Sequence, residues 1–146
     1  RRMKHINLQR LLLGGVVAGL VIIFGEYILN GIILEAQFNA QREKFGLEYP
    51  TAGELAIGAF ITLVYGIVLI WIYVAIRPRF GPGPGTAVVA GLTFWAIAHL
   101  LFLTTLWANN LVTFELAIVS IIWGLFEDPV AALIGAWLYQ ESESPE

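Results

Sequence analysis

Four long and nearly uninterrupted runs of apolar residues constrain this chain more than any other feature of its sequence. A helix needs about 20 mainly apolar residues to cross the hydrocarbon core of a membrane. Open strands are not tolerated there, because their backbone groups would lack hydrogen-bond partners. We therefore expect each run to form one membrane-spanning helix. The expected helices cover residues 8–34, 54–76, 86–108 and 114–139.

The composition also favours a membrane protein over a soluble one. Hydrophobic residues make up 58% of the 146 residues and charged residues 13%, with a mean hydropathy of +0.78, whereas a soluble domain is about half apolar and a quarter charged. We predict an all-α fold, a four-transmembrane-helix bundle that forms one membrane domain over residues 1–146. The net charge of −3 provides no basic surface for nucleic acid. The lack of cysteine excludes disulfides and thiol nucleophiles within this chain.

The segments between the runs are polar or rich in helix breakers. Residues 35–53 are expected to hold a short interfacial helix, and Thr51 and Glu54 have the spacing of a capping box that opens the second helix. Glycine and proline in residues 77–85 predict a tight turn. Residues 109–113 form a short uncharged turn, and residues 140–146 an acidic tail.

Basic residues predict the orientation of the chain, because they collect on the cytoplasmic side of membrane proteins. Six fall on the side of the termini and two on the other, so both termini are expected to be cytoplasmic. The larger group is Arg1, Arg2, Lys4, Arg10, Arg77 and Arg79, and the smaller one is Arg42 and Lys44. An aromatic belt is expected at the same interface as the larger group. Its residues are Trp71, Tyr73, Trp137 and Tyr139.

Three short matches suggest an internal repeat. The segment VVAGL occurs at residues 16–20 and 88–92, ELAI at 54–57 and 115–118, and Trp-x-Tyr at 71–73 and 137–139. The matches occur in the same order, which favours two tandem helical hairpins in a parallel repeat. The alternative is chance, because these residues are common in membrane helices.

Small residues mark the faces on which the helices are expected to pack. Gly15 and Gly19 form a GxxxG pair, which lets two helix backbones approach closely. At 100° per residue, Glu26 and Asn30 fall within about 60° of that pair. In the fourth helix, Gly124 and Gly135 share one face with Asp128. The close-packing faces of these two helices therefore also carry polar groups.

Two adjacent acids lie near the middle of the fourth helix. An acidic side chain at the bilayer centre costs roughly 2.5–3.5 kcal/mol on insertion scales, so Glu127 and Asp128 require an explanation. One reading is a proton or cation site, or a donor to a buried ligand. The other is a structural lock, in which the two carboxyl groups bond to side chains of neighbouring helices.

His99, Glu26 and Asn30 are the remaining polar candidates. His99 is expected to lie on the Trp95 side of the third helix, away from its small-residue face. It either pairs with Glu127 or Asp128, or serves as an axial ligand to a haem or a chlorophyll-type pigment. No other metal site is expected. Glu26 is expected to bond Asn30 and another helix, or to line a polar entrance.

The sequence resembles uncharacterised small four-helix membrane proteins of bacteria. The resemblance rests on residues 7–15, 76–84 and 123–129, and it covers most of the chain. It implies a four-helix fold in the bacterial cytoplasmic membrane and no particular activity.

The expected function is that of an integral membrane subunit or accessory protein in a larger assembly, with other membrane subunits or further copies of itself as partners. Lipid is the expected contact, and a pigment or haem-type cofactor is a further candidate. The alternative is a small proton- or cation-coupled transporter or channel that uses the intramembrane carboxylates. We do not expect an enzyme, because the chain has no phosphate loop, HExxH, GxSxG or dinucleotide-binding motif.

Overall fold

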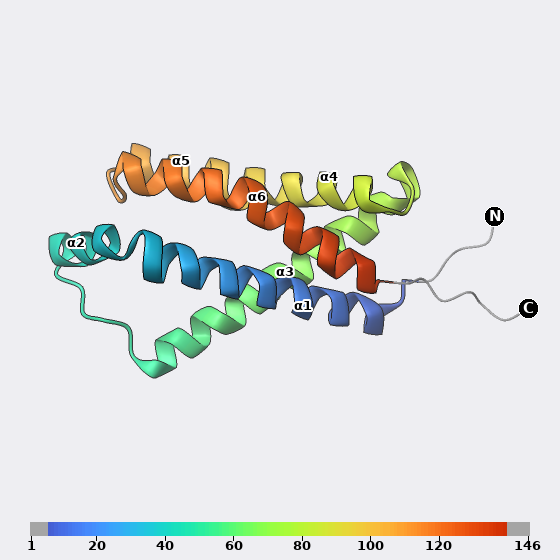
Figure 1. The fold of residues 1–146 in the computed structure, drawn as a ribbon, viewed down its shortest axis with the longest axis horizontal. Coiled ribbons are helices and arrows are strands. Elements are labelled where there is room, and N and C mark those ends of the chain that lie inside the picture. Colours follow the sequence, from blue (N-terminus) through green and yellow to red (C-terminus); the bar gives the residue numbers. More distant parts are fainter. Residues whose placement is uncertain (1–5, 140–146) are drawn as a thin grey trace, which may run out of the picture.

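A computed structural model describes residues 6–139 of the chain. Figure 1 shows helices joined by short connections. Arg1, Arg2, Lys4 and the predicted acidic tail at 140–146 lie outside the described residues. The helical elements are α1 (Leu8–Ile28), the π-helical turn η1 (Leu29–Ile33), α2 (Glu35–Phe45), α3 (Ala52–Phe80), α4 (Pro84–Trp95), the π-helical turn η2 (Ala96–Leu101), α5 (Phe102–Ala108) and α6 (Phe114–Leu138).

The four predicted membrane-spanning helices are confirmed. They are the continuous helices Leu8–Ile33, Ala52–Phe80, Pro84–Ala108 and Phe114–Leu138, each long and apolar enough to cross a membrane. The first and third of these each include one of the π-helical turns. The chain therefore has the architecture of a multi-pass membrane protein arranged as a four-helix bundle.

The second membrane helix is longer than expected at both ends. The predicted capping box is present, because the Glu54 backbone donates to Thr51 Oγ1 at 3.3 Å and the Thr51 backbone donates to the Glu54 carboxylate at 2.8 Å. At the other end the helix passes through Pro78 and stops only at Gly81, which has a φ of 82°. The turn predicted for residues 77–85 is thus confined to 81–83. Pro78 lies in the last turn of the helix, where it lacks the N–H that would donate to the Val74 carbonyl.

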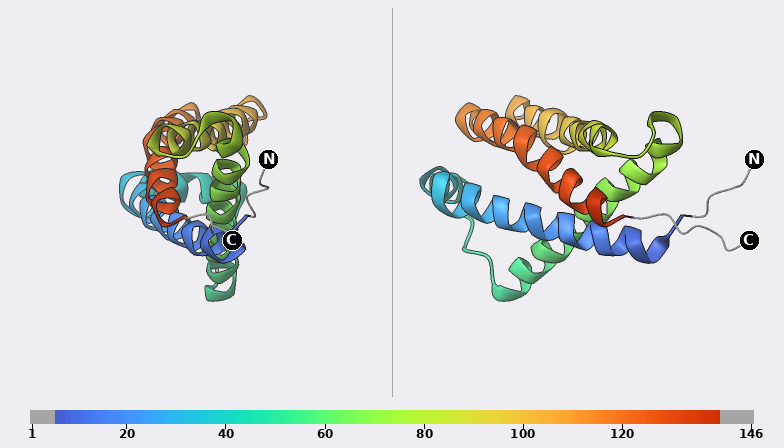
Figure 2. Two further views of the ribbon diagram at one scale, coloured as in Figure 1. Left: turned by 90° about the vertical axis from the view of Figure 1, so that its right-hand side faces the viewer. Right: turned by 45° about the vertical axis from the view of Figure 1, so that its right-hand side comes forward.

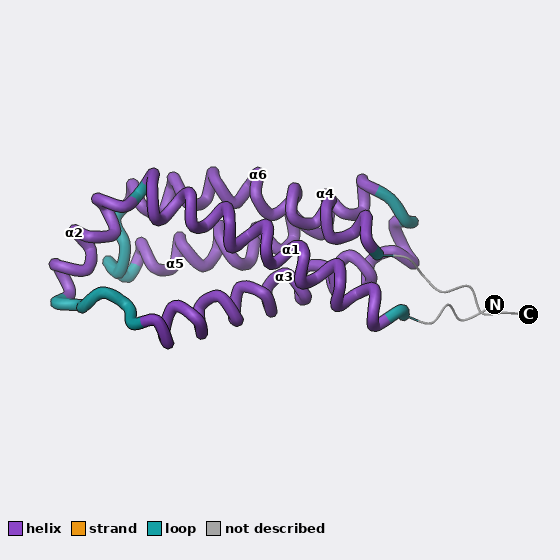
Figure 3. Tube along the Cα trace, turned by 60° about the horizontal axis from the view of Figure 1, so that its bottom comes forward, coloured by secondary structure: helices purple, strands orange, loops and turns teal. Residues whose placement is uncertain are grey.

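The connections alternate between the two ends of the bundle. Figure 3 shows the loops at residues 46–51 and 109–113 at one end, with the 81–83 turn at the other end. The described chain also starts and finishes at this second end, where α1 begins and α6 ends (Figures 1 and 2). Arg10, Arg77 and Arg79 lie at this end, which is called here the terminal end. Arg42 and Lys44 lie on α2 at the opposite end, called here the α2 end.

The predicted aromatic belt is only half correct. Trp71 and Trp137 are exposed, as expected for side chains at a membrane interface. Tyr73 and Tyr139 are buried instead, because their rings lie against the guanidinium of Arg77 at 5.6 and 5.1 Å. The two tyrosines therefore cover a cation inside the bundle rather than facing lipid.

Glycines hold the helices together at three crossings. A Cβ at Gly66 in α3 would collide with the backbone of Gly15 and Gly19 in α1. The GxxxG pair thus faces a third glycine, which permits the close approach that this motif favours.

The other two crossings involve α6. Gly14 of α1 meets Gly135 backbone to backbone, so a Cβ on either residue would overlap the other. Gly91 of α4 packs on Pro129, where a Cβ would lie 2.5 Å from the proline Cα. The backbone of α6 is therefore fixed against both α1 and α4.

The first half of α3 departs from the bundle. In Figure 2 this half runs away from the other helices. Residues 52–61 are all exposed, and Gly66 is the first buried residue of the helix. Its surface is apolar, with Leu55, Ile57 and Phe60 each about 60% or more exposed. This half of α3 offers a free apolar face to lipid or to another helix.

The glycine crossing of α1 and α3 predicts a sharp difference between two alanine substitutions in one helix. Gly66→Ala is expected to cost about 1–3 kcal/mol of stability, because the new methyl group forces the two backbones apart. Gly58→Ala is the matched control, since a Cβ there meets nothing within 4 Å. Thermal unfolding of the detergent-solubilised protein measures both. Equal melting temperatures for the two variants would contradict the crossing.

Candidate functional site

Four ionisable side chains from three helices meet in the interior of the bundle. Glu26 comes from α1, His99 from η2, and Glu127 and Asp128 from α6. Asp128 lies about 21 Å from the Phe114 end and about 15 Å from the Leu138 end of α6, at 1.5 Å per residue. The group, called here the acid–histidine cluster, thus falls at the depth of the hydrocarbon core if the helices cross a membrane.

Asp128 and His99 form the buried centre of the cluster. The Asp128 side chain is 0% exposed, and its Oδ2 lies 2.9 Å from His99 Nδ1. This is one of the two pairings expected for the histidine. With Nδ1 beside this carboxylate, Nε2 of the same ring lies on the side of Glu26.

The orientation of His99 differs from the expectation, and the π-helical turn η2 explains the difference. In a regular α-helix, eight residues at 100° each would place His99 about 80° away from Gly91. A π-turn takes up one more residue than an α-turn, so the rotation across η2 is smaller. Both residues therefore face α6. The His99 ring lies against Gly124, where a Cβ would be 2.5 Å from the ring.

Glu26 reaches the cluster from α1. Its Oε1 lies 3.7 Å from His99 Nε2. Its second oxygen accepts a hydrogen bond from Asn30 Nδ2 at 2.6 Å, which holds the carboxylate in place. The bond between Glu26 and Asn30 is the one expected from their spacing. Glu26 is the most accessible member of the cluster, with 33% of its side chain exposed.

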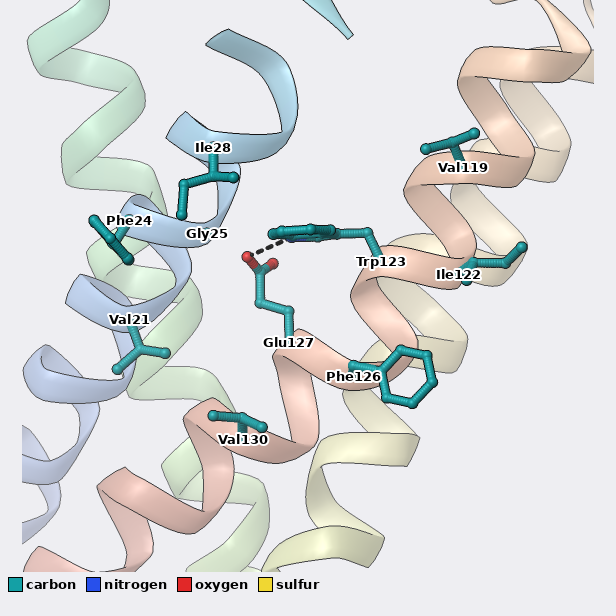
Figure 4. A pocket seen from close by; sticks show the side chains of 10 residues that line it. All are labelled: Val21, Phe24, Gly25, Ile28, Val119, Ile122, Trp123, Phe126, Glu127 and Val130. Carbon is teal, nitrogen blue, oxygen red and sulfur yellow. Dashed lines mark hydrogen bonds between the residues drawn. The ribbon is translucent and has the colours of Figure 1, made fainter. Parts of the chain in front are cut away.

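Glu127 precedes Asp128 on α6, and its side chain is buried, with 8% exposed. Its Oε1 accepts a hydrogen bond from Trp123 Nε1 at 3.0 Å, the dashed line in Figure 4. Its Oε2 is buried and has no hydrogen-bond partner within the described residues. The carboxyl group points at Gly25, where a Cβ would collide with it. One ligand-type atom each from Glu26, His99 and Glu127 lies within 4.8 Å of the others.

A partly open cavity of about 240 Å³ adjoins the cluster, with the exposed residues Tyr65 and Phe102 in its lining. It runs from Glu26, His99 and Asp128 toward the α2 end, where Phe38 of α2 borders it. Its remaining lining residues are Ile22, Asn30, Thr62, Phe94, Ala98, Leu103 and Ser120.

A second and larger hollow, of about 550 Å³, lies between α1 and α6 (Figure 4). Apolar side chains from both helices line it, and Glu127 is its one ionisable residue. Several of these side chains, Phe24 and Phe126 among them, are exposed on the outside of the bundle. This hollow, called here the α1–α6 groove, therefore brings the outer surface close to the Glu127 carboxyl group. The lining residues are Val21, Phe24, Gly25, Ile28, Val119, Ile122, Trp123, Phe126, Glu127 and Val130.

The geometry gives no support to a pigment bound through His99. Both ring nitrogens lie beside carboxylate oxygens, at 2.9 and 3.7 Å. The adjoining cavity of about 240 Å³ is below the roughly 300–1,000 Å³ of ordinary ligand pockets. Trp95, which was expected to lie beside the flat ring of a haem or pigment, instead donates its indole N–H to the Ile121 carbonyl at 2.8 Å.

The predicted packing glycines have different roles in the structure. Gly15, Gly19 and Gly135 lie at backbone crossings, whereas Gly124 makes room for the His99 ring. Sequence reasoning missed Gly25 and Trp123, which shape the space around Glu127. Trp123 could have been found, because it precedes Glu127 by one helical turn.

Comparisons of this chain with protein-family models, curated protein sequences and solved structures find no match. The chemistry of the cluster is therefore argued from its own geometry. Three carboxyl groups surround one imidazole, so the cluster carries more acidic than basic groups and favours a cation.

The contact between Gly25 and Glu127 predicts a stability effect that depends on the acid. Gly25→Ala is expected to cost about 1 kcal/mol, because the new methyl group displaces the Glu127 carboxyl group and breaks its bond to Trp123. In a Glu127→Ala background the same change is expected to be neutral or stabilising, since alanine is the better helix former. Chemical or thermal unfolding in detergent measures both effects.

Gly31→Ala in η1 is the control, because its Cβ would make only ordinary contact with Tyr27 at 3.6 Å. A cost for Gly25→Ala that is the same with and without Glu127 would show that the two residues do not meet.

Proposed function

We propose that this protein is a small cation-coupled transporter or channel, with the acid–histidine cluster as the place where the cation binds during its passage. The observation that carries the proposal is the buried Glu127 carboxyl group, whose Oε2 lacks a partner among the described residues and which lies near an imidazole and a second carboxylate. Ionisable residues inside membrane helices commonly mark ion pathways. The proton is included among the candidate cations.

An ion site accounts for the cluster better than a structural lock does. A lock would satisfy its buried polar atoms within the protein, because each unpaired one costs about 1–3 kcal/mol. Here Glu127 Oε2 and Asp128 Oδ1 are both buried without a hydrogen-bond partner in the described part of the chain. Oxygen atoms left in this state are suited to a cation that arrives from outside.

The cavity supports a route to the cluster from one side. Asn30 and Ser120 are polar residues of its lining, and Phe38 of α2 borders it at the α2 end. Toward the terminal end, the crossing of Gly14 with Gly135 closes the bundle. This conformation would then admit a cation from the α2 end, and release to the other side would require that crossing to open.

The proposal places the protein in the bacterial cytoplasmic membrane with both termini inside. The distribution of charge supports this orientation, because Arg10, Arg77 and Arg79 lie at the terminal end and only Arg42 and Lys44 lie at the other. Under this orientation the cavity faces the outer side.

A tandem hairpin repeat is part of the same proposal. Gly19 and Gly91, at equivalent positions of the VVAGL segment, both form the crossing within their own hairpin. Glu26 and His99 follow these glycines by similar distances and face each other at 3.7 Å. Each hairpin also has a π-helical turn in its first helix. A duplicated hairpin would produce all three correspondences.

The second candidate function is that of a subunit in a larger membrane assembly. The exposed first half of α3 favours it, because residues 52–61 have no buried side chain in the isolated chain. The α1–α6 groove offers a further apolar surface, suited to a lipid chain or to a helix of another protein. Stoichiometric partners that co-purify with the chain in mild detergent would favour this function over transport by the chain alone.

Flux through liposomes that contain the purified protein tests the transport proposal. Proton- and metal-sensitive dyes inside the vesicles are expected to report cation entry. Glu127→Gln is expected to lower the rate of entry at least tenfold, because a neutral amide replaces the carboxylate. Glu115→Gln is the control, because Glu115 is an exposed residue outside the cluster that accepts a hydrogen bond from Gln37. Wild-type flux no faster than in empty liposomes would contradict the proposal.

A further inference from the structure

We infer that Glu26, His99 and Glu127 form a binding site for a divalent transition-metal cation, with Zn²⁺ as its best-matched ion. The inference rests on the proposed function, because it names the class of cation that the cluster takes. It also makes a separate claim, since a metal can bind here whether or not it crosses the membrane.

The three ligand atoms are already close to the spacing of a metal site. In a tetrahedral zinc site with bonds of 2.0–2.2 Å, the ligand atoms lie roughly 3.3–3.6 Å apart. His99 Nε2 and Glu26 Oε1 are 3.7 Å apart, and the whole set lies within 4.8 Å. A shift of about 1 Å by the Glu127 carboxyl group completes the spacing. Gly25 leaves that carboxyl group room beside α1.

Each ligand is held by a second contact on its far side. Asp128 lies at 2.9 Å from Nδ1 of His99, Asn30 donates to Oε2 of Glu26, and Trp123 donates to Oε1 of Glu127. His99 Nε2 and Glu26 Oε1 lie 3.7 Å apart, and Glu127 Oε2 is buried without a hydrogen-bond partner among the described residues. Metal-binding histidines usually have such a carboxylate on the other ring nitrogen. The three ligands are therefore oriented for a shared ion.

The ligand set selects the kind of metal. One imidazole with two carboxylates suits Zn²⁺ and neighbouring first-row dications, whereas Cu⁺ prefers sulfur ligands. Ca²⁺ takes six to eight oxygen ligands, more than these side chains offer. Three protein ligands also leave one coordination position open, which permits the exchange that a transported ion requires.

The charge of a dication fits the depth of the site. Glu26 and Glu127 together carry two negative charges when ionised, and a divalent cation neutralises both. Without an ion, the carboxylates have only neutral donors and one imidazole near them. A bound dication therefore removes the main electrostatic cost of placing this pair inside the bundle.

Isothermal titration calorimetry of Zn²⁺ into the purified full chain in detergent micelles tests the inference. We expect one ion per chain, with Glu26→Gln, His99→Gln and Glu127→Gln each weakening binding at least tenfold. Glu115→Gln and His5→Gln are the controls and should bind as the wild type does. Ca²⁺ should not bind stoichiometrically. Wild-type protein without one-per-chain Zn²⁺ binding, or ligand variants that bind equally well, would overturn the site.

X-ray absorption of the zinc-loaded His5→Gln chain keeps the test valid if a ligand variant fails to fold. His99 is then the only imidazole, since the chain has 2 histidines. The spectrum should show one imidazole and oxygen ligands at about 2.0–2.2 Å. A zinc shell without imidazole would refute the site.

The outcomes separate this inference from the proposed function. Zinc binding without any cation flux in liposomes would support the metal site and contradict transport. Proton flux that depends on Glu127, in protein that binds no zinc, would support transport and overturn the metal site.

Discussion

The pairing of Asp128 with His99 is the interaction on which the rest of the site depends. A fully buried carboxylate is tolerated only beside a partner that compensates its charge or donates hydrogen bonds to it. To supply that partner, η2 and α6 must approach until the imidazole lies against Gly124. The pairing also directs Nε2 at Glu26, so it determines how α1 meets the other two helices.

Glycine and the π-helical turns provide the space and the direction that this pairing needs. Gly91 and Gly124 let α6 lie close to the third membrane helix, and Gly25 leaves room for the Glu127 carboxyl group. The turn η2 rotates His99 toward α6. Single π-turns inside helices are often found at functional sites. The local irregularity and the polar cluster therefore have one common explanation.

Two hollows on opposite sides of the cluster connect its geometry with a role in the membrane. The partly open cavity reaches Glu26, His99 and Asp128, while the α1–α6 groove reaches Glu127. Ionisable groups beside two such hollows lie where an ion could be held inside the bilayer. The glycine crossings toward the terminal end close the bundle beyond them. These features together favour a binding place on a route over a passive polar contact.

Apolar run length made the four helices predictable, because the hydrocarbon core fixes how many residues must be apolar. The acid pair and the GxxxG motif were also predictable, because acidic residues and paired glycines stand out within such apolar runs. The direction of His99 was not predictable, because a regular 100° rotation does not anticipate the π-turn at 96–101. The partners of Gly25 and Gly66 depend on helix crossings, which no local pattern specifies.

A double-mutant cycle on His99→Gln and Asp128→Asn tests the central claim most directly. The free energy of unfolding is measured for the wild type, both single variants and the double variant in the same micelles. Hydrogen-bonded pairs between membrane helices show coupling of about 0.6 kcal/mol on average and up to about 1.7 kcal/mol. The pairing described here predicts coupling within or above that range, because Asp128 is fully buried and its Oδ2 lies 2.9 Å from His99 Nδ1. If the losses of unfolding free energy in the two single variants add up to the loss in the double variant within error, the two side chains do not interact. The cluster is then not assembled around them.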